Sequence, residues 1–456
     1  MIFAFGYYMI SFLVSLVNPF WGLVGFVCSL LLRFQDHYPQ IMVIKPFTFL
    51  LFGMLLGCLL NKEKLAIANW FQDKLILALL VISMVGLSLL APSELVNETY
   101  LFLCSISLYF FASRILQSPS QFLILFIAMA ASISYLAYLA IIDINLNGEL
   151  SSYIDPRSGR WQGFGYYQNS NEFGQLMITT VPFLLAIIMA SKSLILKLLS
   201  IAMMLVMLFV MIQCASRTVM VTFALMIVLT FMLRGKGNLI KKVMIGASMS
   251  LLLLGVLTFM PGPIQERMST VLDARSDESF QGRTRAWGYG FDMLSWYPIT
   301  GVGKGQWMEY HGLMPHNSYV QIMAELGIFG IIVFIWLLLR SFTQFSPILV
   351  NNSTTDPPSI ELDLFGDNEL EELKPDQKDS DVILPEKEVK QIDNFSRTIA
   401  IAVLVTFSAW LFYIFLGNQG YSVWTYFYIG LCAAVQNFLP QKEIIQDKPL
   451  FEESEY

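Results

Sequence analysis

The chain is 456 residues long, and 56% of its residues are hydrophobic while only 14% are charged. Soluble domains carry about a quarter charged residues, and the mean hydropathy here is +0.61, so an ordinary soluble protein is excluded. The formal net charge of −6 is uneven, because 13 acidic but only 4 basic residues lie between Asp356 and Asp393, and it therefore carries no information on the substrate.

The apolar residues form long runs without charged side chains, such as residues 75–93, 198–216 and 243–265. Each run is close to the roughly 20 residues that a helix needs to cross a bilayer. A helix satisfies its backbone hydrogen bonds internally, so it is the element expected to span lipid. We therefore predict an all-α, polytopic helical membrane protein. The candidate spans are residues 2–17, 20–33, 44–60, 75–92, 99–116, 120–142, 173–191, 194–213, 217–234, 239–260, 317–340, 397–416 and 421–439.

The first two candidates, residues 2–17 and 20–33, are short and are separated by Asn18-Pro19. Thirteen crossings would leave the two termini on opposite sides of the membrane, whereas the loop charges place the C-terminal tail inside. We expect these two segments to form one crossing plus an interfacial or re-entrant piece. The prediction is then about 12 transmembrane helices.

Loops rich in Lys and Arg orient the helices, because cytoplasmic loops carry an excess of these residues. Three such loops are predicted to lie in the cytoplasm: residues 61–74, 191–197 and 234–242. The transmembrane body is then residues 1–342, and its larger outward loops are residues 143–172 and 261–315.

The segment 343–396 is acidic, poor in hydrophobic residues and rich in Pro and Asp, which is typical of a disordered cytoplasmic insert. A regulatory or partner-binding role is the alternative to a solvated linker. Residues 397–440 are predicted to form two C-terminal transmembrane helices around the turn "GNQG". Residues 441–456 are predicted to be a cytoplasmic tail.

Five cysteines are scattered through the chain without a CxxC or Cys/His spacing. Neither a metal site nor a disulfide framework is predicted from that pattern.

The outward loop 143–172 contains "SGRWQGFGYYQNSNEFGQL", in which aromatic residues alternate with Arg160, Asn169 and Asn171. Such a composition suits sugars, whose C–H faces stack on rings while their hydroxyls form hydrogen bonds. It equally suits an aromatic belt at the level of the lipid headgroups. Both interpretations stay open at this point.

Arg217 lies in "CASRTVM", between two apolar runs on the outward side. It is either an interfacial side chain that reaches the headgroups or part of an anion site. Arg283, Arg285 and Lys304 are predicted to emerge on the same side. Arginine binds phosphate oxygens in a two-pronged geometry, so these cations could hold a lipid diphosphate.

His316 stands at the predicted start of a spanning helix, in "PHNSY". The positive end of a helix disfavours the imidazolium ion, so the ring should be neutral and able to accept a proton. Asn317 could orient this ring or bind a substrate hydroxyl. For His316 the alternative is a structural role at the start of the helix. Glu325, deeper in the helix, is expected to be a buried partner of an arginine.

The run from "DESFQGRTRAWGYGFDML" through "YPITGVGKG" to "HNSYVQIMAELGIFG" resembles the signature region of the O-antigen ligase and polysaccharide polymerase superfamily. These bacterial envelope proteins move glycans from undecaprenyl diphosphate carriers. The segments "GFGYYQNSNEFGQL" and "SRT" are similar to other parts of the family pattern. The opening "NPFWGLVGFVCSLLLRFQDHYPQI" is similar to the branch associated with exosortase systems.

The resemblance implies a GT-C-like helical fold in the bacterial inner membrane and a metal-independent glycosyltransferase whose active site faces the periplasm. It places the catalytic residues at Arg217, Arg283 and His316. The arginines would hold the diphosphate and stabilise the charge that it gains, and His316 would take the proton of the acceptor hydroxyl or position that hydroxyl. The predicted substrate-binding residues are Arg285, Asn317, Tyr319, Lys304, Arg160, Asn169 and Asn171.

The expected function is transfer of a glycan from undecaprenyl diphosphate to lipid A core, a growing polysaccharide or a protein, and ligase and polymerase are not separated. The expected partners are membrane lipids, the carrier-linked donor and the acceptor, with no nucleic acid, cofactor or metal. The alternative is a transporter of a small anion or other solute, which should show charged or broken helices near mid-membrane and repeated halves. A non-catalytic scaffold would not need the Arg/Arg/His combination.

Overall fold

The computed structural model describes residues 1–350 and 392–439 except for residues 68, 235–243, 245–247 and 249–277. Nearly all of the predicted span 239–260, most of the acidic insert and the predicted tail 441–456 lie outside the described residues.

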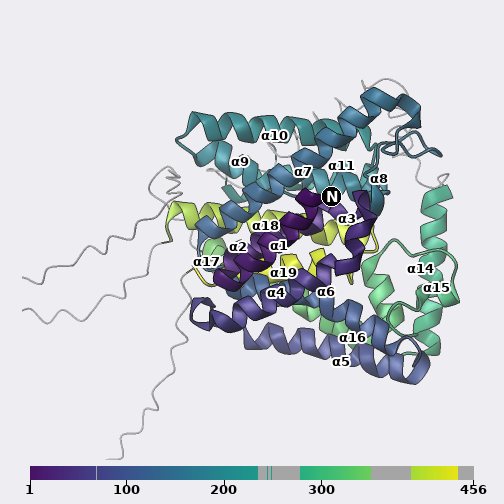
Figure 1. The fold of residues 1–456 in the computed structure, drawn as a ribbon. Helices are drawn as coiled ribbons and strands as arrows, with labels where there is room; N and C mark the ends of the chain where they lie inside the picture. Colours follow the sequence, from purple (N-terminus) through teal and green to yellow (C-terminus); the bar gives the residue numbers. More distant parts are fainter. Residues whose placement is uncertain (68, 235–243, 245–247, 249–277, 351–391, 440–456) are drawn as a thin grey trace, which may run out of the picture.

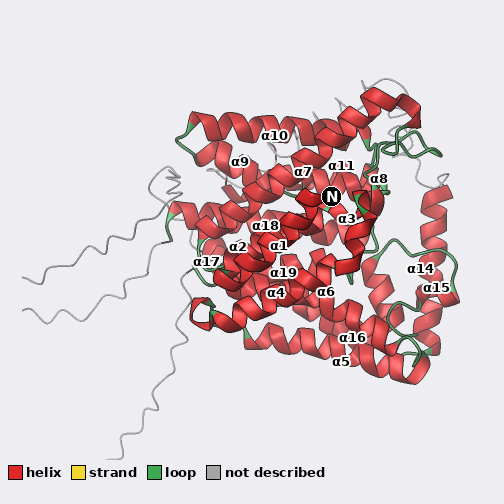
Figure 2. Ribbon diagram, viewed as in Figure 1, coloured by secondary structure: helices red, strands yellow, loops and turns green. Residues whose placement is uncertain are grey.

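Helices form nearly all of the regular structure in the described part of the chain (Figure 2), and its extended pairing is one isolated bridge between Ile154 and Trp161. Eight helical stretches of the described residues are long and apolar enough to cross a membrane, and one of them, Ser170–Ala190, consists of two consecutive helices. The prediction of an all-α, polytopic helical membrane protein is confirmed.

The N-terminal segment forms two short helices, α1 (Ile2–Val17) and α2 (Pro19–Leu32), that pack against each other. The break falls at Asn18, whose backbone is extended and whose side chain accepts a hydrogen bond from the Phe20 N–H at 3.0 Å. Pro19 starts α2 because a proline at the first helical position loses no intrahelical hydrogen bond. The short helix α3 (Phe34–His37), a 3₁₀ turn (Pro39–Ile44) and α4 (Pro46–Leu60) follow.

The helices of the central region start within five residues of the predicted spans. They are α5 (Trp70–Leu90), α6 (Leu95–Ile115), α7 (Pro119–Asn147), α8 (Ser170–Ile178), α9 (Val181–Ala190), α10 (Leu194–Gln213) and α11 (Arg217–Arg234).

The predicted span 173–191 consists of two helices, α8 and α9, that are interrupted at Thr179 and Thr180. Pro182 explains the interruption, because it has no N–H to donate and its ring crowds the carbonyl four residues earlier.

The C-terminal helices are α14 (Glu278–Trp296), α15 (Trp307–Tyr310), α16 (Ser318–Thr343), α17 (Ser346–Val350), α18 (Asn394–Phe415) and α19 (Val423–Val435). The described part of the predicted loop 261–315 therefore begins with a helix, α14, which packs against α16. In Figure 1, α14 and α15 lie at one end of the spanning helices and α17 lies at the other.

The two C-terminal helices occupy the centre of the bundle (Figure 1). Every residue of α19 after Val423 is buried, and α19 packs against α6 while α18 packs against α9 and α11. The outermost α10 is far more exposed, as expected of a helix that faces lipid. The loop between α18 and α19, residues 416–422, is buried or half-buried.

Helix α16 is interrupted at Gly327, which adopts a left-handed backbone (φ 69°, ψ −168°). The chain that follows α14 enters this break: the Val302 N–H donates to the Ala324 carbonyl at 2.9 Å, and the Ile328 N–H donates to the Pro298 carbonyl at 2.9 Å. These bonds replace the intrahelical ones that are lost, so α14 and α16 are held together as one unit.

The buried carboxylate of Glu325 binds the same inserted chain. It accepts hydrogen bonds from the backbone N–H groups of Gly305 (3.0 Å) and Trp307 (3.3 Å) and from Gln321 Nε2 (3.3 Å). The expectation of an arginine partner for Glu325 is therefore wrong. Backbone amides satisfy this buried acid instead, which gives it a structural role.

Candidate functional site

Asn171, at the start of α8, connects the polar loop before α8, which carries Arg160, to the start of α11 through hydrogen bonds. Its Oδ1 atom accepts hydrogen bonds from Arg160 Nη2 at 2.9 Å and from Ser216 Oγ at 2.8 Å. Arg160 Nε also donates to the Cys214 carbonyl at 2.8 Å. The residue that follows Ser216 is Arg217, so this network positions the first turn of α11.

A second network joins α8 to the start of α16. Gln419, in the loop between α18 and α19, donates from Nε2 to Glu172 Oε1 at 3.0 Å and from its backbone N–H to Ser318 Oγ at 2.9 Å. Ser318 Oγ in turn donates to the Gly417 carbonyl at 2.7 Å. Because Glu172 follows Asn171, the two networks connect the segment that carries Arg217 with the segment that carries His316.

Arg217 and His316 lie in similar local structures. A left-handed residue precedes the helix in each case, Ala215 (φ 45°) before α11 and His316 itself (φ 47°) before α16. A capping residue follows, Ser216 for α11, and Asn317 for α16. Non-glycine residues with positive φ are uncommon and concentrate at functional sites.

Arg283, on α14, lies close enough to His316 to act on its ring. Burial lowers the pKa of His316, and the positive charge of Arg283 lowers it further. Trp287 Nε1 donates to the Pro315 carbonyl at 2.7 Å, which fixes α14 beside the residue before His316. The imidazole is therefore neutral near pH 7, as the sequence argument predicted, but burial and Arg283 are the causes.

Asn317 and Asn169 act as helix caps. Asn317 Oδ1 accepts from the backbone N–H groups of Tyr319 (3.0 Å) and Val320 (3.1 Å), and Asn169 Oδ1 accepts from the Asn171 N–H (2.9 Å). The Tyr319 hydroxyl donates to the Leu411 carbonyl at 3.2 Å. These contacts fix the helix starts, and substrate binding by Asn169, Asn317 and Tyr319 stays a prediction.

Lys304 and Arg285 contact residues other than His316. Lys304 is buried and forms an ion pair with Glu98. The sequence predicted a substrate-binding role for Lys304 and did not predict this acidic partner. The exposed Arg285 contacts the Gln281 carbonyl through Nε at 3.4 Å.

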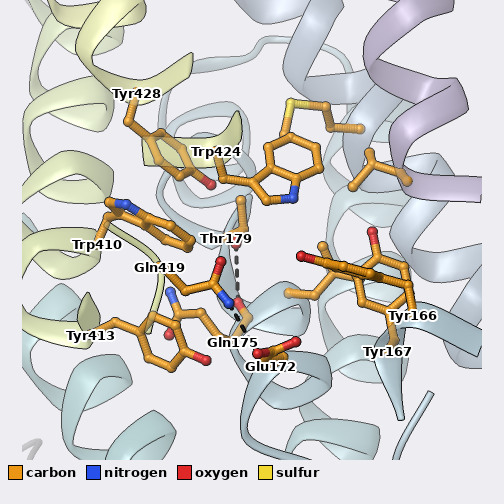
Figure 3. Close-up of a pocket in the computed structure, with 13 residues that line it drawn as sticks. Tyr166, Tyr167, Glu172, Gln175, Thr179, Trp410, Tyr413, Gln419, Trp424 and Tyr428 are labelled. Carbon is orange, nitrogen blue, oxygen red and sulfur yellow. Dashed lines mark hydrogen bonds between the residues drawn. The ribbon is translucent and has the colours of Figure 1, made fainter. Parts of the chain in front are cut away.

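A pocket between α2, α8, α18 and α19 adjoins this end of the bundle, and sequence reasoning did not find it (Figure 3). Glu172 and Tyr413 connect it to the candidate site, because Tyr413 interacts electrostatically with both Glu172 and Arg283. Glu172, an acid among the polar residues of the segment 163–175, was the signal in the sequence that could have indicated the pocket. The residues that line this pocket are Leu31, Met129, Tyr166, Tyr167, Glu172, Gln175, Leu176, Thr179, Trp410, Tyr413, Gln419, Trp424 and Tyr428.

Replacing Asn171 with alanine should weaken both the fold and the site, since Arg160 and Ser216 each lose an acceptor. Leaving polar groups unpaired costs about 1–3 kcal/mol each, so the melting temperature of the purified protein should fall measurably. Asn147→Ala is the matched control, because Asn147 is exposed and bonds only Asp143 among the described residues. Equal melting temperatures for the two variants would contradict this role of Asn171.

Residues 202–335 match the protein family described as O-antigen ligase. The matched region includes Arg217, Arg283 and His316, whereas Asn171 and Glu172 precede it. A comparison of the whole chain with curated proteins found no match. The family match confirms the resemblance to the O-antigen ligase and polymerase superfamily, and residues 202–335 of this polytopic helical membrane protein are the part that is similar to the O-antigen ligase family.

Proposed function

We propose that this protein is a membrane glycosyltransferase of the O-antigen ligase type, which transfers a glycan from undecaprenyl diphosphate to an acceptor on the periplasmic face of the bacterial inner membrane. The acceptor is lipid A core, a growing polysaccharide or a protein. The observation that carries the proposal is the half-buried His316 beside Arg283, in a segment that hydrogen bonds through α8 connect to the start of α11, where Arg217 lies. The O-antigen ligase match over the same region supports it.

In the proposed reaction, an acceptor hydroxyl attacks the anomeric carbon of the donor's first sugar. The bond between that carbon and the diphosphate oxygen breaks, and undecaprenyl diphosphate leaves with one additional negative charge. His316 takes the proton of the hydroxyl. A positioned general base contributes about 10²–10⁴-fold to a rate.

Arg217 and Arg283 would bind the diphosphate and stabilise the charge that develops on it. A preorganised donor aimed at developing charge contributes about 10²–10³-fold. Guanidinium groups remain protonated at every physiological pH, so the proposed transfer needs no metal ion, and the carrier-linked glycan is a substrate rather than a cofactor.

The proposal is tested with purified protein in liposomes that contain undecaprenyl diphosphate carrying a labelled glycan. Separate samples contain lipid A core, oligosaccharide or protein acceptors. The expected result is loss of the donor together with an equal amount of free undecaprenyl diphosphate and labelled acceptor. Intact donor in all samples, with uptake of a labelled anion into the liposomes, would favour a transporter instead.

Arg283→Gln should change the pH dependence of transfer as well as its rate. The pKa of His316 lies below its ordinary value, partly because of Arg283, so the wild-type rate should fall only when the pH drops below that lowered pKa. Without the neighbouring cation the pKa rises, and the acidic limb of kcat/KM should move to higher pH. The control is Arg285→Gln, two residues away and exposed, and an equal shift in both variants would contradict the assignment.

A further inference from the structure

The lining of the pocket in Figure 3 differs in chemistry from the cationic site beside it. Six of its residues are aromatic: four tyrosines and two tryptophans. The polar members carry a carboxylate, two amides and a hydroxyl, namely Glu172, Gln175, Gln419 and Thr179. None of the lining residues in the described part of the chain is Lys or Arg. A diphosphate would therefore find no charge partner in this lining, whereas a neutral polar ligand would find rings and acceptors.

Gln175 gives the clearest indication that a ligand is missing. Its side chain is buried, with 4% exposure, and its Oε1 atom has no hydrogen-bond partner among the described residues. Buried polar atoms are nearly always paired. An acceptor that lines a pocket without a donor is satisfied when a ligand brings an O–H or N–H group.

Glu172 provides a second acceptor on the same wall (Figure 3). Gln419 Nε2 binds one of its oxygens at 3.0 Å and so holds the carboxylate in place. A carboxylate has about four acceptor positions, so this bond leaves capacity for further donors. The rings of Tyr413 and Trp410 lie across the pocket from Glu172.

The pocket is attached to both parts of the candidate site. Tyr413 interacts electrostatically with Arg283 and with Glu172, and the Gln419 backbone donates to Ser318, two residues after His316. A ligand bound here would therefore sit next to the place where the diphosphate and the acceptor hydroxyl are proposed to meet.

A lipid chain is a poorer occupant than a sugar. An isoprenoid would cover the rings but would leave Gln175 and Glu172 without donors, and burying unpaired polar groups is unfavourable. The edge of a sugar ring offers hydroxyl or amide donors to these two acceptors, and its C–H faces pack on aromatic rings.

We propose that this pocket is a sugar subsite, in which Gln175 and Glu172 accept hydrogen bonds from the hydroxyl-bearing edge of one sugar ring. The inference rests on the proposed function, because it takes a glycan as the ligand. The sugar belongs either to the carrier-linked donor or to the acceptor, and the same acceptors and rings would serve both.

The test is direct binding to the full-length protein in detergent or nanodiscs, which does not require turnover. The probes are carrier-linked glycan extracted from the cells that make the protein, undecaprenyl diphosphate alone, and free oligosaccharide released from the same envelopes. Gln175→Leu should weaken binding of a sugar-bearing probe by about tenfold or more, since one buried hydrogen bond is lost. Binding of undecaprenyl diphosphate alone should be unchanged.

Gln344→Leu is the matched control, because Gln344 is also buried with an unpartnered side-chain atom in the described structure, but it follows the C-terminal end of α16. Glu172→Gln is a second variant that preserves shape and removes charge. If Gln175 had only a structural role, the Gln175→Leu variant should bind sugar as the wild type does. If the pocket is a sugar subsite, the Gln175→Leu variant should bind sugar more weakly than the wild type, although its fold should be at least as stable as that of the wild type.

The outcomes separate the two proposals. Weaker binding of the carrier-linked glycan assigns the pocket to the donor's sugar, and weaker binding of the free oligosaccharide assigns it to the acceptor. Unchanged affinities for both sugar-bearing probes in Gln175→Leu and Glu172→Gln would overturn the subsite and leave the proposed function standing. Failure of the wild-type protein to bind any of the three probes would count against the proposed function itself.

Discussion

His316→Ala should lower the rate of glycan transfer by about 10²–10⁴-fold, the contribution of a general base, while the affinity for undecaprenyl diphosphate changes little. His316 is half-buried and held neutral by its surroundings, so it can accept a proton but contributes no positive charge to the binding of the carrier. The measurement is single-turnover transfer in liposomes together with equilibrium binding of the carrier.

His311→Ala is the control for this prediction. His311 lies five residues earlier in the same segment, and its ring stacks on Tyr289 at 4.2 Å between centroids. Its loss removes a packing contact and should leave the rate of transfer within a few-fold of the wild type. Comparable losses of activity in the two variants would mean that His316 acts through the shape of the segment rather than as a base.

Gly327→Ala should cause the largest loss of stability among single alanine substitutions of the glycines in α14 and α16. A Cβ atom at Gly327 would lie 2.5 Å from the Ile299 carbonyl oxygen, in a left-handed backbone with φ 69°. Positive φ alone costs a residue with a side chain about 1–3 kcal/mol, and the contact with rigid backbone adds to it. The melting temperature should fall by many degrees, or the protein should fail to purify as a single species.

Gly288→Ala tests whether that effect is specific. Gly288 is exposed on α14, no atom lies within 4 Å of its added Cβ, and its backbone is helical. Alanine is favoured over glycine inside helices by about 1 kcal/mol, so this variant should be as stable as the wild type or more stable. Equal stability of the Gly327→Ala and Gly288→Ala variants would show that the chain does not insert into the break of α16.

Continuous apolar runs made most spanning helices predictable, and α10 (Leu194–Gln213) starts at the predicted residue. Periodicity cannot reveal which apolar helix is central, because α10 and α19 have similarly apolar sequences. Their burial is decided by tertiary packing. The helix α14 was missed because its sequence includes three glycines and mixed polarity, and packing against α16 overrides these weak helix propensities.

The polar pairings between residues far apart in the chain could not be predicted from the sequence. Glu98 and Lys304 are 206 positions apart, and Glu172 and Gln419 are 247 positions apart. Only the fold brings such residues together. The catalytic assignment of Arg217, Arg283 and His316 came from their resemblance to a family pattern, and the structure adds the burial of His316, the charge of Arg283 near its ring and the neighbouring pocket.

A structure of this protein with undecaprenyl diphosphate bound would test the proposed site most directly. We expect the two phosphates to contact the guanidinium groups of Arg217 and Arg283, with the His316 ring facing the carrier's terminal phosphate oxygen, where the sugar would be attached. Phosphates bound away from both arginines, or at the end of the bundle where α17 lies, would contradict it.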